Sequence, residues 1–372
     1  MKTANGFQII EMFEQFSPKQ YAMEGDPIGL HVGQLNKPVT KVMIALDVLE
    51  KVVDEAIECG VELIIAHHPL IYRPLKKIDT TVAGGRIIEK LIKHDIAVYA
   101  AHTNLDVAKG GVNDLLADAL QLQDIEVLIP THETALKKLV VYVPKADEQK
   151  IREALGKAGA GAVGNYSYCS FSGEGTGRFL PGEGSEPAIG SLGKLEAVAE
   201  VRVETIFPEN IEKKVLSAMI KAHPYEEVAY DIYKLENKGE SLGLGKIGVL
   251  AEEMSLEQFS EHVKQTLDVD KVRVVGDLHS PIKKVAVLGG DGNKYFTTAK
   301  FKGADVYVTG DMYYHTAHDA MMIGLNIVDP GHNVEKVMKK GVARILKEMC
   351  HERNLDVEFI PSEINTDPFR FI

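Results

Sequence analysis

Short apolar runs alternate with amphipathic segments along much of this chain, and this alternation restricts the fold more than any other feature. VTKVMIALD (39–47), VELIIA (61–66) and IAVYAA (96–101) have the length and composition of buried strands. Helical periodicity fills the residues between them. Strands separated by helices predict a mainly parallel sheet covered on both faces, and we take IEVLI (125–129) as its closing strand.

The same alternation returns in the last third of the chain. KGESLGLG (238–245) has the composition of a linker, and a long helix, GHNVEKVMKKGVARILKEM (331–349), follows the last strands. The sequence therefore predicts two related α/β lobes with mainly parallel sheets, over residues 1–130 and 245–372. The strands expected in the second lobe include KKVAVLGGDG (283–292), ADVYVTGD (304–311) and LNIVD (325–329).

Residues 135–240 have a different pattern, which predicts an inserted domain. Strand, helix, two strands, helix and strand follow one another, and this β-α-β-β-α-β order is that of a ferredoxin-like unit. Surface loops tolerate such insertions. The glycine-rich stretch 172–190 lacks the Gly-Lys-Ser/Thr ending of a phosphate loop, so we interpret it as a mobile hairpin connection or one that a partner chain orders.

Composition excludes some classes of function. The formal net charge of −12 disfavours sequence-independent binding to nucleic acid or to an anionic membrane. No stretch approaches the roughly 20 apolar residues that cross a bilayer, and the N-terminus lacks the apolar centre of a signal peptide. The three cysteines are far apart and follow no metal-type spacing. We therefore expect a cytoplasmic protein whose partners are small molecules, metals or other proteins.

Polar residues with ligand chemistry follow several predicted strands. The carboxyl ends of parallel strands share one edge of a sheet, so residues that are distant in the sequence can converge there. Histidines and carboxylates without a thiolate suit a divalent ion such as zinc, iron or manganese. The candidates are His67 and His68 after LIIA, His102 and Asp106 after VYAA, Gly310 and Asp311 after VYVT, and His332 and Glu335 after NIVD.

The histidine pair leaves two arrangements open. Successive strand residues point to opposite faces, so His67 and His68 face one ion only if the chain bends, as Pro69 would allow. Otherwise the two rings serve two ions, with Asp106 and Glu335 bridging them.

Several of these residues also have ordinary structural explanations. Glu335 could complement the positive end of its helix, with His332 a surface residue beside it, and Asp106 could stabilise the HTNLD turn. Their shared position at strand ends favours the metal site. His102, and His315 with His318 on a predicted helix, are candidate proton carriers, although surface or core histidines are as common.

Taken together, the segments AHHPL, HTNLD, GGDG, VTGD and the late GH-x-x-E resemble the NIF-three-like family of GTP cyclohydrolase 1 type 2 homologues. The resemblance covers about residues 1–130 and 245–372. It implies two α/β lobes flanking a dinuclear metal centre, assembly into toroidal hexamers, and a specific ligand set. The implied ligands are His67, His68, Asp106, His332 and Glu335.

The chain departs from the family pattern at one ligand. Members often place the late glutamate four residues after the histidine, whereas position 336 here is lysine and the acid is Glu335. The segment 135–240, with HPYEEVAYDIY, is similar to the CutA-like and PII-like trimeric domains inserted in longer bacterial members. That similarity implies a module for trimer formation or regulation.

Two functions follow from this reading. The first is a metal-dependent hydrolase acting on a purine nucleotide, with two divalent ions (zinc, iron or manganese) in each chain of a homohexameric ring of trimers. The second is a non-enzymatic metal chaperone, store or regulator whose inserted domain is a sensor. Ring-shaped nucleic-acid binding is a third, which the net charge disfavours.

Overall fold

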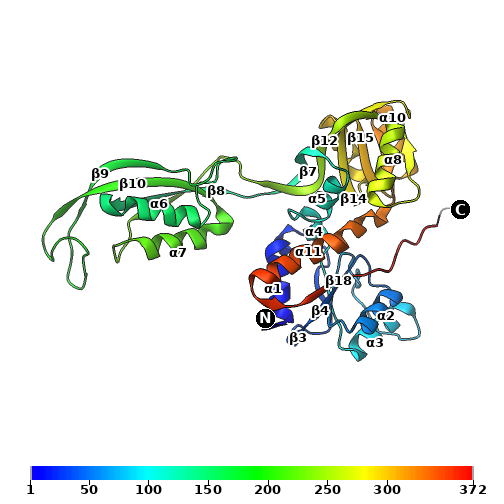
Figure 1. Ribbon diagram of the computed structural model, residues 1–372, viewed down its shortest axis with the longest axis horizontal. Coiled ribbons are helices and arrows are strands. Elements are labelled where there is room, and N and C mark those ends of the chain that lie inside the picture. Colours follow the sequence, from blue (N-terminus) through cyan, green and yellow to red (C-terminus); the bar gives the residue numbers. More distant parts are fainter. Residues whose placement is uncertain (1, 371–372) are drawn as a thin grey trace. The chain divides into compact units, whose positions relative to one another are not determined.

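The computed structural model describes residues 2–370, which form two compact units (Figure 1). One unit comprises the described residues up to His132 together with those from Leu242 onward, and the other is Glu133–Ser241. Several sheets with flanking helices make up the chain, so the predicted mixed α/β class is confirmed. Between residues 2 and 370 no helix has both the length and the apolar character to cross a bilayer.

The first sheet of the larger unit has the strand order β18-β4-β5-β6-β2. β18, β4, β5 and β6 run parallel, and β2 pairs antiparallel with β6. Every residue of β5 and β6 is buried, as their uninterrupted apolar sequences predict. The strands are β2 (Gly29–Val32), β4 (Lys41–Ala45), β5 (Leu63–Ala66), β6 (Ala97–Ala100) and β18 (Glu358–Pro361), with helices α2 (Glu50–Cys59) and α3 (Ala83–Lys93).

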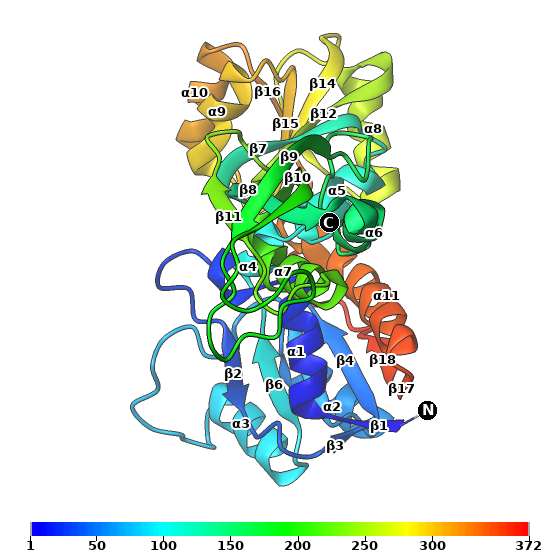
Figure 2. The same ribbon diagram turned by 90° about the vertical axis from the view of Figure 1, so that its left-hand side faces the viewer.

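The second sheet of this unit has the order β13-β16-β15-β14-β12-β7 (Figure 2). Its centre, β14-β15-β16, is parallel, while β12 runs antiparallel to β14 and β13 runs antiparallel to β16. The IEVLI run lies in β7, so its assignment as the closing strand of the first sheet was wrong. The strands are β7 (Gln123–Glu133), β12 (Ser241–Ser255), β13 (Arg273–Val275), β14 (Pro281–Asp291), β15 (Val306–Gly310) and β16 (Asn326–Asp329).

The segment interpreted as a linker, 238–245, is partly strand, because β12 begins at Ser241. Its glycines permit close packing and are not marks of flexibility. A Cβ on Gly243 would lie 1.9 Å from the carbonyl oxygen of Ile129, and Gly245 has φ +65°. The composition was therefore misread, because glycine in a strand marks a close approach as well as a loop.

The end of the chain joins the two lobes of the larger unit. Helix α11 (Val337–Glu352) follows the second sheet and packs against β4, and β18 then pairs with β4 in the first sheet. In Figure 1 this orange helix leads from the region of β14 to that of β18. One hydrophobic core includes residues of both sheets, among them Ile44, Ile65 and Val308. The two lobes therefore share one hydrophobic core.

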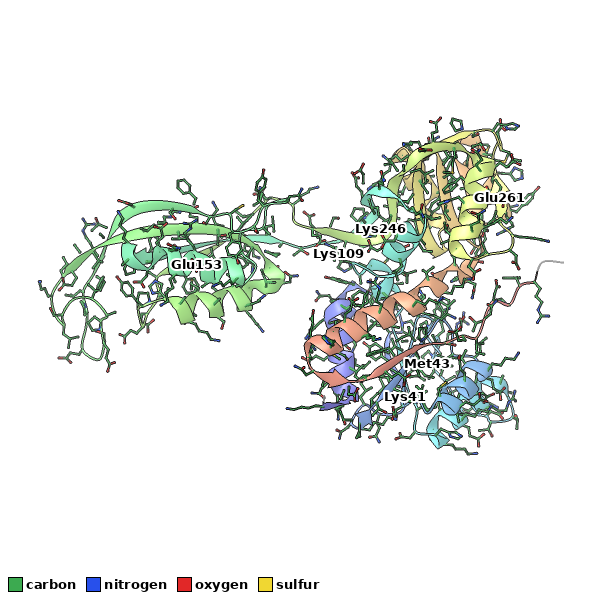
Figure 3. The ribbon with its side chains drawn as sticks, in the orientation of Figure 1. Lys41, Met43, Lys109, Glu153, Lys246 and Glu261 are labelled. Carbon is green, nitrogen blue, oxygen red and sulfur yellow. The ribbon has the colours of Figure 1, made fainter. Side chains whose placement is uncertain are left out.

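A buried ion pair ties β12 to helix α5 (Val112–Ala119). Lys246, labelled in Figure 3, is 5% exposed, and its Nζ lies 2.9 Å from Asp114 Oδ1. Since an unpaired buried charge is costly, we expect Asp114→Ala to lower the free energy of unfolding by about 3 kcal/mol. Urea unfolding followed by circular dichroism measures this. The double variant Asp114→Ala, Lys246→Met should recover most of the loss, and equal stability of the two variants would contradict the explanation.

The smaller unit is a single antiparallel sheet of order β11-β8-β10-β9 with two helices on one face. Its core lies between sheet and helices and includes Val141, Ile151, Val203 and Val215. The elements follow in the order β8 (Leu136–Pro144), α6 (Glu148–Lys157), β9 (Phe171–Phe179), β10 (Glu196–Pro208), α7 (Glu212–Ala222) and β11 (Tyr230–Lys234).

The glycine-rich stretch 172–190 is not wholly a hairpin connection. Its first part forms edge strand β9, which pairs along its whole length with β10. A Cβ on Gly177 would lie 2.0 Å from Glu200 Oε2, so at this position glycine makes room for a side chain of the neighbouring strand. Glycine lowers strand propensity, which is why the sequence alone indicated a loop.

Short elements complete the larger unit. A small sheet of order β17-β1-β3 lies beside α1, and the asparagine before α1 caps it through a capping box with Gln8. These elements are β1 (Lys2–Asn5), α1 (Gly6–Phe16), β3 (Pro38–Val39), α4 (Thr103–Val107), α8 (Leu256–Leu267), α9 (Phe296–Phe301), α10 (Tyr314–Met322) and β17 (Leu355–Asp356).

Candidate metal centre

The histidine pair leaves β5 where the strand ends. The backbone N–H groups of His67 and His68 donate to the carbonyls of Ala45 (3.0 Å) and Leu46 (2.9 Å). Both residues lie in a bend, outside the strand. Their Nε2 atoms are 3.7 Å and 3.0 Å from the same oxygen, Oε2 of Glu335. The pair therefore faces one centre, which strand alternation alone would forbid.

The next strand contributes a histidine and a carboxylate. HTNLD, read from the sequence as a turn, forms the short helix α4 with His102 at its N-cap. One turn later, Asp106 places Oδ1 3.6 Å from His67 Nε2. The His102 ring lies 5.3 Å from the His67 ring, centroid to centroid, so residues that follow neighbouring parallel strands do meet.

The second lobe contributes His332 and Glu335 from a 3₁₀ helix, His332–Lys336, which precedes α11. Residues three apart in a 3₁₀ helix eclipse one another, so both side chains lie on one side. His332 Nε2 is 3.2 Å from Glu335 Oε2. This geometry explains how an acid at position 335, in place of 336, still reaches the histidines.

The GGDG run (289–292) makes room for these residues. A Cβ on Gly290 would lie 2.8 Å from Glu335 Oε1, and Gly290 has φ +64°. The Gly289 N–H donates to Asn113 Oδ1 and the Gly292 N–H to Thr309 Oγ1, so neither is free for an anion. A run such as GGDG can either present N–H groups to an anion or form only a strand-to-helix turn, and these hydrogen bonds support the turn.

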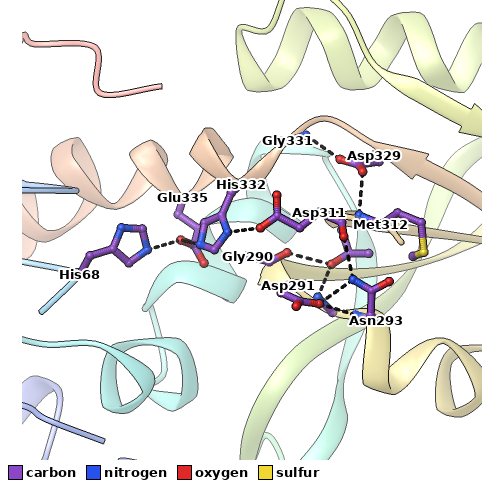
Figure 4. A network of polar contacts seen from close by, with 12 residues as sticks. His68, Gly290, Asp291, Asn293, Asp311, Met312, Asp329, Gly331, His332 and Glu335 are labelled. Carbon is purple, nitrogen blue, oxygen red and sulfur yellow. Dashed lines mark hydrogen bonds and ion pairs between the residues drawn. The ribbon is translucent and has the colours of Figure 1, made fainter. Parts of the chain in front are cut away.

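Among the described residues, three overlapping groups have ligand atoms close enough to hold a metal ion. Figure 4 shows His68 and His332 reaching the Glu335 carboxylate from opposite sides. Within each group all ligand atoms lie within 4.8 Å of one another. The groups are His67, His68 and His102; His68, His332 and Glu335; and His67, Asp106 and Glu335.

Two buried polar atoms of this cluster have no hydrogen-bond partner in the part of the chain that the structure describes. They are His67 Nε2 and Asp106 Oδ1, which face each other at 3.6 Å. Buried polar atoms are nearly always paired, so an unpaired nitrogen beside an unpaired carboxylate oxygen fits a site for a cation. Neutral imidazole and carboxylate are also the ligands of divalent ions of borderline character.

Each of the four histidine rings is oriented by a hydrogen bond at its Nδ1 atom. Asp47 Oδ1 accepts from His68 Nδ1 (2.7 Å), and Ala101 O accepts from His67 Nδ1 (3.0 Å). The other two rings have the same arrangement: Asp26 accepts from His102 Nδ1 at 2.8 Å, and Asp311 accepts from His332 Nδ1 at 2.7 Å. An N–H at Nδ1 leaves Nε2 as the ligand nitrogen, as in many metal sites.

Sequence reasoning noted Asp311 but missed Asp26 and Asp47. Asp47 ends the predicted strand 39–47, and the rule that gathered the other strand ends applies equally to it. Asp26 lies in the loop Gly25–Pro27, which does not follow a predicted strand.

Protons hold the cluster together when no cation is bound. Burial alone would lower the histidine pKa values, but hydrogen bonds to Asp47 and Glu335 raise the pKa of His68 to about 10. The hydrogen bond to Glu335 outweighs burial and raises the pKa of His332 to about 9. Burial would raise the pKa of Glu335, yet the histidines hold it well below its usual value. The carboxylates are thus paired with protonated rings.

Asp106 behaves differently, because burial raises its pKa to about 6 against the attraction of His67. The attraction of the neighbouring histidines therefore does not offset the burial of this carboxyl group. A cation beside it would supply the missing compensation.

His315 and His318 are not among these groups. Both are exposed on α10, and their rings contact Tyr314 at 5.4 Å and 4.7 Å. The structure therefore brings together His67, His68, His102, Asp106, His332 and Glu335 but not this pair. A proton-carrying role for His315 and His318 gains no support from their contacts and stays a prediction.

The fold and the cluster together define a two-lobed α/β protein with a buried histidine and carboxylate site whose residues come from both lobes. Comparison with known proteins agrees. The model of the family Duf34/NIF3 (NGG1p interacting factor 3) matches residues 4–368. The chain belongs to this family, as its sequence motifs indicated.

Relatives that match the chain over its whole length share a common name. The chain is 62% identical over 371 residues to the GTP cyclohydrolase 1 type 2 homolog of Bacillus subtilis and 51% identical over 372 residues to that of Listeria innocua, with complete coverage of both proteins. A solved Bacillus cereus protein related to NIF3 is 64% identical, with a TM-score of 0.93 and complete coverage of both chains.

Proposed function

We propose that the chain binds two divalent metal ions and is a metal-dependent hydrolase. The observation that carries this is the position of Glu335, whose Oε2 lies within 3.7 Å of Nε2 of His67, His68 and His332. Two of the ligand groups share only Glu335. One ion would be held by His68, His332 and Glu335, and the other by His67, Asp106 and Glu335. Zinc, iron and manganese suit these ligands.

The side chains around the site have distinct roles in this proposal. Divalent ions held there supply Lewis acidity, which polarises a substrate and acidifies water at neutral pH. His102 is the proton carrier, because Asp26 holds its Nδ1 and leaves Nε2 directed at the cluster. Asp26 in turn is fixed by the backbone N–H of Thr103 at 3.0 Å. The ring is thus positioned before a substrate arrives.

The name of the relatives makes GTP the first substrate to test. Protein loaded in turn with zinc, iron or manganese is expected to release formate from GTP. His68→Ala should reduce both metal content and turnover by about 100-fold or more, because it removes a ligand and one of the three histidines that contact Glu335. The control is His279→Ala, an exposed histidine. Formate assay and metal analysis of the same samples measure both quantities.

The outcomes separate binding from catalysis. Full metal occupancy in a His67→Ala, His68→Ala double variant would contradict the metal site itself. Metal-loaded protein that turns over no nucleotide would contradict the hydrolase and favour the second candidate.

The second candidate is a metal-dependent regulator whose smaller unit is a sensor, and a cavity in that unit favours it. The cavity has a volume of about 810 Å³, large enough for a cofactor-sized ligand. Tyr142, Phe171, Phe179 and Tyr225 contribute aromatic rings to it. Burial, with a hydrogen bond to Glu200, raises the pKa of Tyr225 to about 12, so its hydroxyl remains a donor.

The charged lining restricts the ligand of this cavity. Five glutamates and two arginines line it, so a neutral or cationic ring compound is favoured over a triphosphate. Calorimetric titration with adenosine and with ATP tests this directly, and tighter binding of ATP would contradict it. The lining residues with charge are Glu174, Arg178, Glu200, Arg202, Glu204, Glu226 and Glu227.

Assembly into a homohexameric ring of trimers, with the smaller unit as a CutA-like or PII-like trimer-forming module, belongs to the same proposal. Exposed large apolar side chains of the smaller unit support a partner-covered surface; they include Tyr166, Phe171, Leu180, Leu192 and Leu195. Sedimentation of the full chain measures the assembly.

A further inference from the structure

We infer that the C-terminal segment, residues 362–370, contributes to the candidate metal centre, because its Thr366 positions His68 through Asp47. The inference rests on the proposed metal site. It assigns a role to a segment that follows the last strand and supplies no ligand of its own.

A short chain of hydrogen bonds carries the inference. The Thr366 hydroxyl donates to Asp47 Oδ2, and the other oxygen of that carboxylate accepts from His68 Nδ1 at 2.7 Å. His68 Nε2 then lies 3.0 Å from Glu335 Oε2. Both oxygens of Asp47 are therefore engaged, one by the segment and one by the ring.

The hydroxyl contact has a physical consequence for the ring. Asp47 is partly exposed, at 27%, so packing alone does not fix its carboxylate. A second hydrogen bond on the far oxygen restrains rotation about the Cβ–Cγ bond and so fixes the direction in which Asp47 accepts from His68. Residues that hydrogen-bond to the ligands of a metal site hold those ligands within narrow limits of orientation.

The sheet explains why the segment reaches Asp47. β18 runs parallel to β4, and Ser362 continues this pairing by donating its N–H to Ile44 O at 2.9 Å. Asp47 and Thr366 follow these two neighbouring strands at their carboxyl ends. The topology that places the ligand residues at one edge of the sheet thus also places Thr366 beside Asp47.

Contacts upstream of Thr366 hold the segment in place. Ser362 Oγ donates to Glu55 Oε2 at 2.5 Å, and the Glu363 N–H donates to Glu55 Oε1 at 2.7 Å. Lys339 Nζ donates to the carbonyl of Ser362 at 2.7 Å. Ile364 packs against the core on the α2 side of the first sheet. These anchors do not involve Thr366, so its hydroxyl can be removed without releasing the segment.

The test compares Thr366→Val, which removes the hydroxyl at nearly constant shape, with Thr366→Ser, which keeps it. Cobalt(II) is the probe, with its dissociation constant measured by chelator competition and its visible spectrum recorded. We expect Thr366→Val to weaken binding about 10-fold and to shift the spectrum, while Thr366→Ser stays near the wild type. Equal binding and spectra for all three proteins would overturn the inference.

A double-mutant cycle separates positioning from general destabilisation. In an Asp47→Ala background Thr366→Val should have no further effect on the dissociation constant, whereas a merely structural role would persist. Truncation after Asp367 keeps the hydroxyl and should bind like the wild type, and truncation after Asn365 should behave like Thr366→Val.

Failure of the proposed metal site gives a different result. If the wild type binds no cobalt, the proposed function falls, and the inference is decided on the metal-free protein by the NMR signal of the His68 Nδ1 proton. Slow exchange of that proton in the wild type and in Thr366→Ser, with fast exchange in Thr366→Val, supports the positioning role. Equal exchange in all three overturns it.

Discussion

Glu335→Gln is expected to reduce the affinity of the chain for divalent ions by roughly 1,000-fold, well beyond the 10–100-fold typical of an outer residue. The carboxylate is 3% exposed and contacts three histidines with one oxygen. The amide keeps the size of the side chain but removes its charge. Since both proposed ions use Glu335, both should be lost together.

Asp106→Asn should have a more limited effect, because Asp106 belongs to only one of the two groups that contain Glu335. It should remove one ion and leave the other bound. Metal analysis and calorimetric titration of the two variants compare these losses. Glu348→Gln, the same substitution at an exposed ion pair with Arg344, is the control. Two ions retained in Glu335→Gln would refute the shared-ligand arrangement.

The sequence predicted the lobes well where burial determines the pattern. β5 and β6 are buried at every residue, and their apolar runs have the lengths expected of strands between two helical layers. Helix α2 ends at Gly60, whose φ of +67° is the left-handed conformation that a C-terminal glycine predicts. Local chemistry sufficed for these elements.

Strand partnership could not be predicted in the same way. IEVLI has a clear strand pattern, but nothing in its residues says that β7 pairs in the second sheet. The same limit applied to Thr366, which meets Asp47 only because β18 returns to β4 after the second lobe. Such contacts depend on topology, which residue patterns do not encode.

The candidate ligands were predictable because they combine ligand chemistry with a strand end. Asp26 acts only through its hydrogen bond with His102 Nδ1, and such a contact is identified only once the fold is known. His315 and His318 have no such support, since helical spacing of histidines is common on exposed surfaces, and their role as proton carriers stays a prediction.

Metal binding at neutral pH is expected to release about two protons, because cations must displace those on His68 and His332. With pKa values of about 10 and about 9, both rings are protonated at pH 7 in the metal-free protein. Up to about pH 9, the apparent affinity should therefore increase about 100-fold for each unit by which the pH rises. Calorimetry at pH 7 in buffers of different ionisation enthalpy counts the protons directly.

The same pKa values make the stability of the metal-free chain depend on pH. A ring whose folded pKa exceeds its unfolded value of 6.5 stabilises the fold fully below pH 6.5, and this stabilisation is lost as the pH rises through the folded pKa. The free energy of unfolding of the metal-free protein should therefore decrease between pH 7 and pH 10. That of the metal-loaded protein should not, because its rings are already deprotonated. His332→Gln should release one proton fewer. Metal binding without proton release would show that the rings are neutral at pH 7 and that carboxylate pairing does not hold their protons.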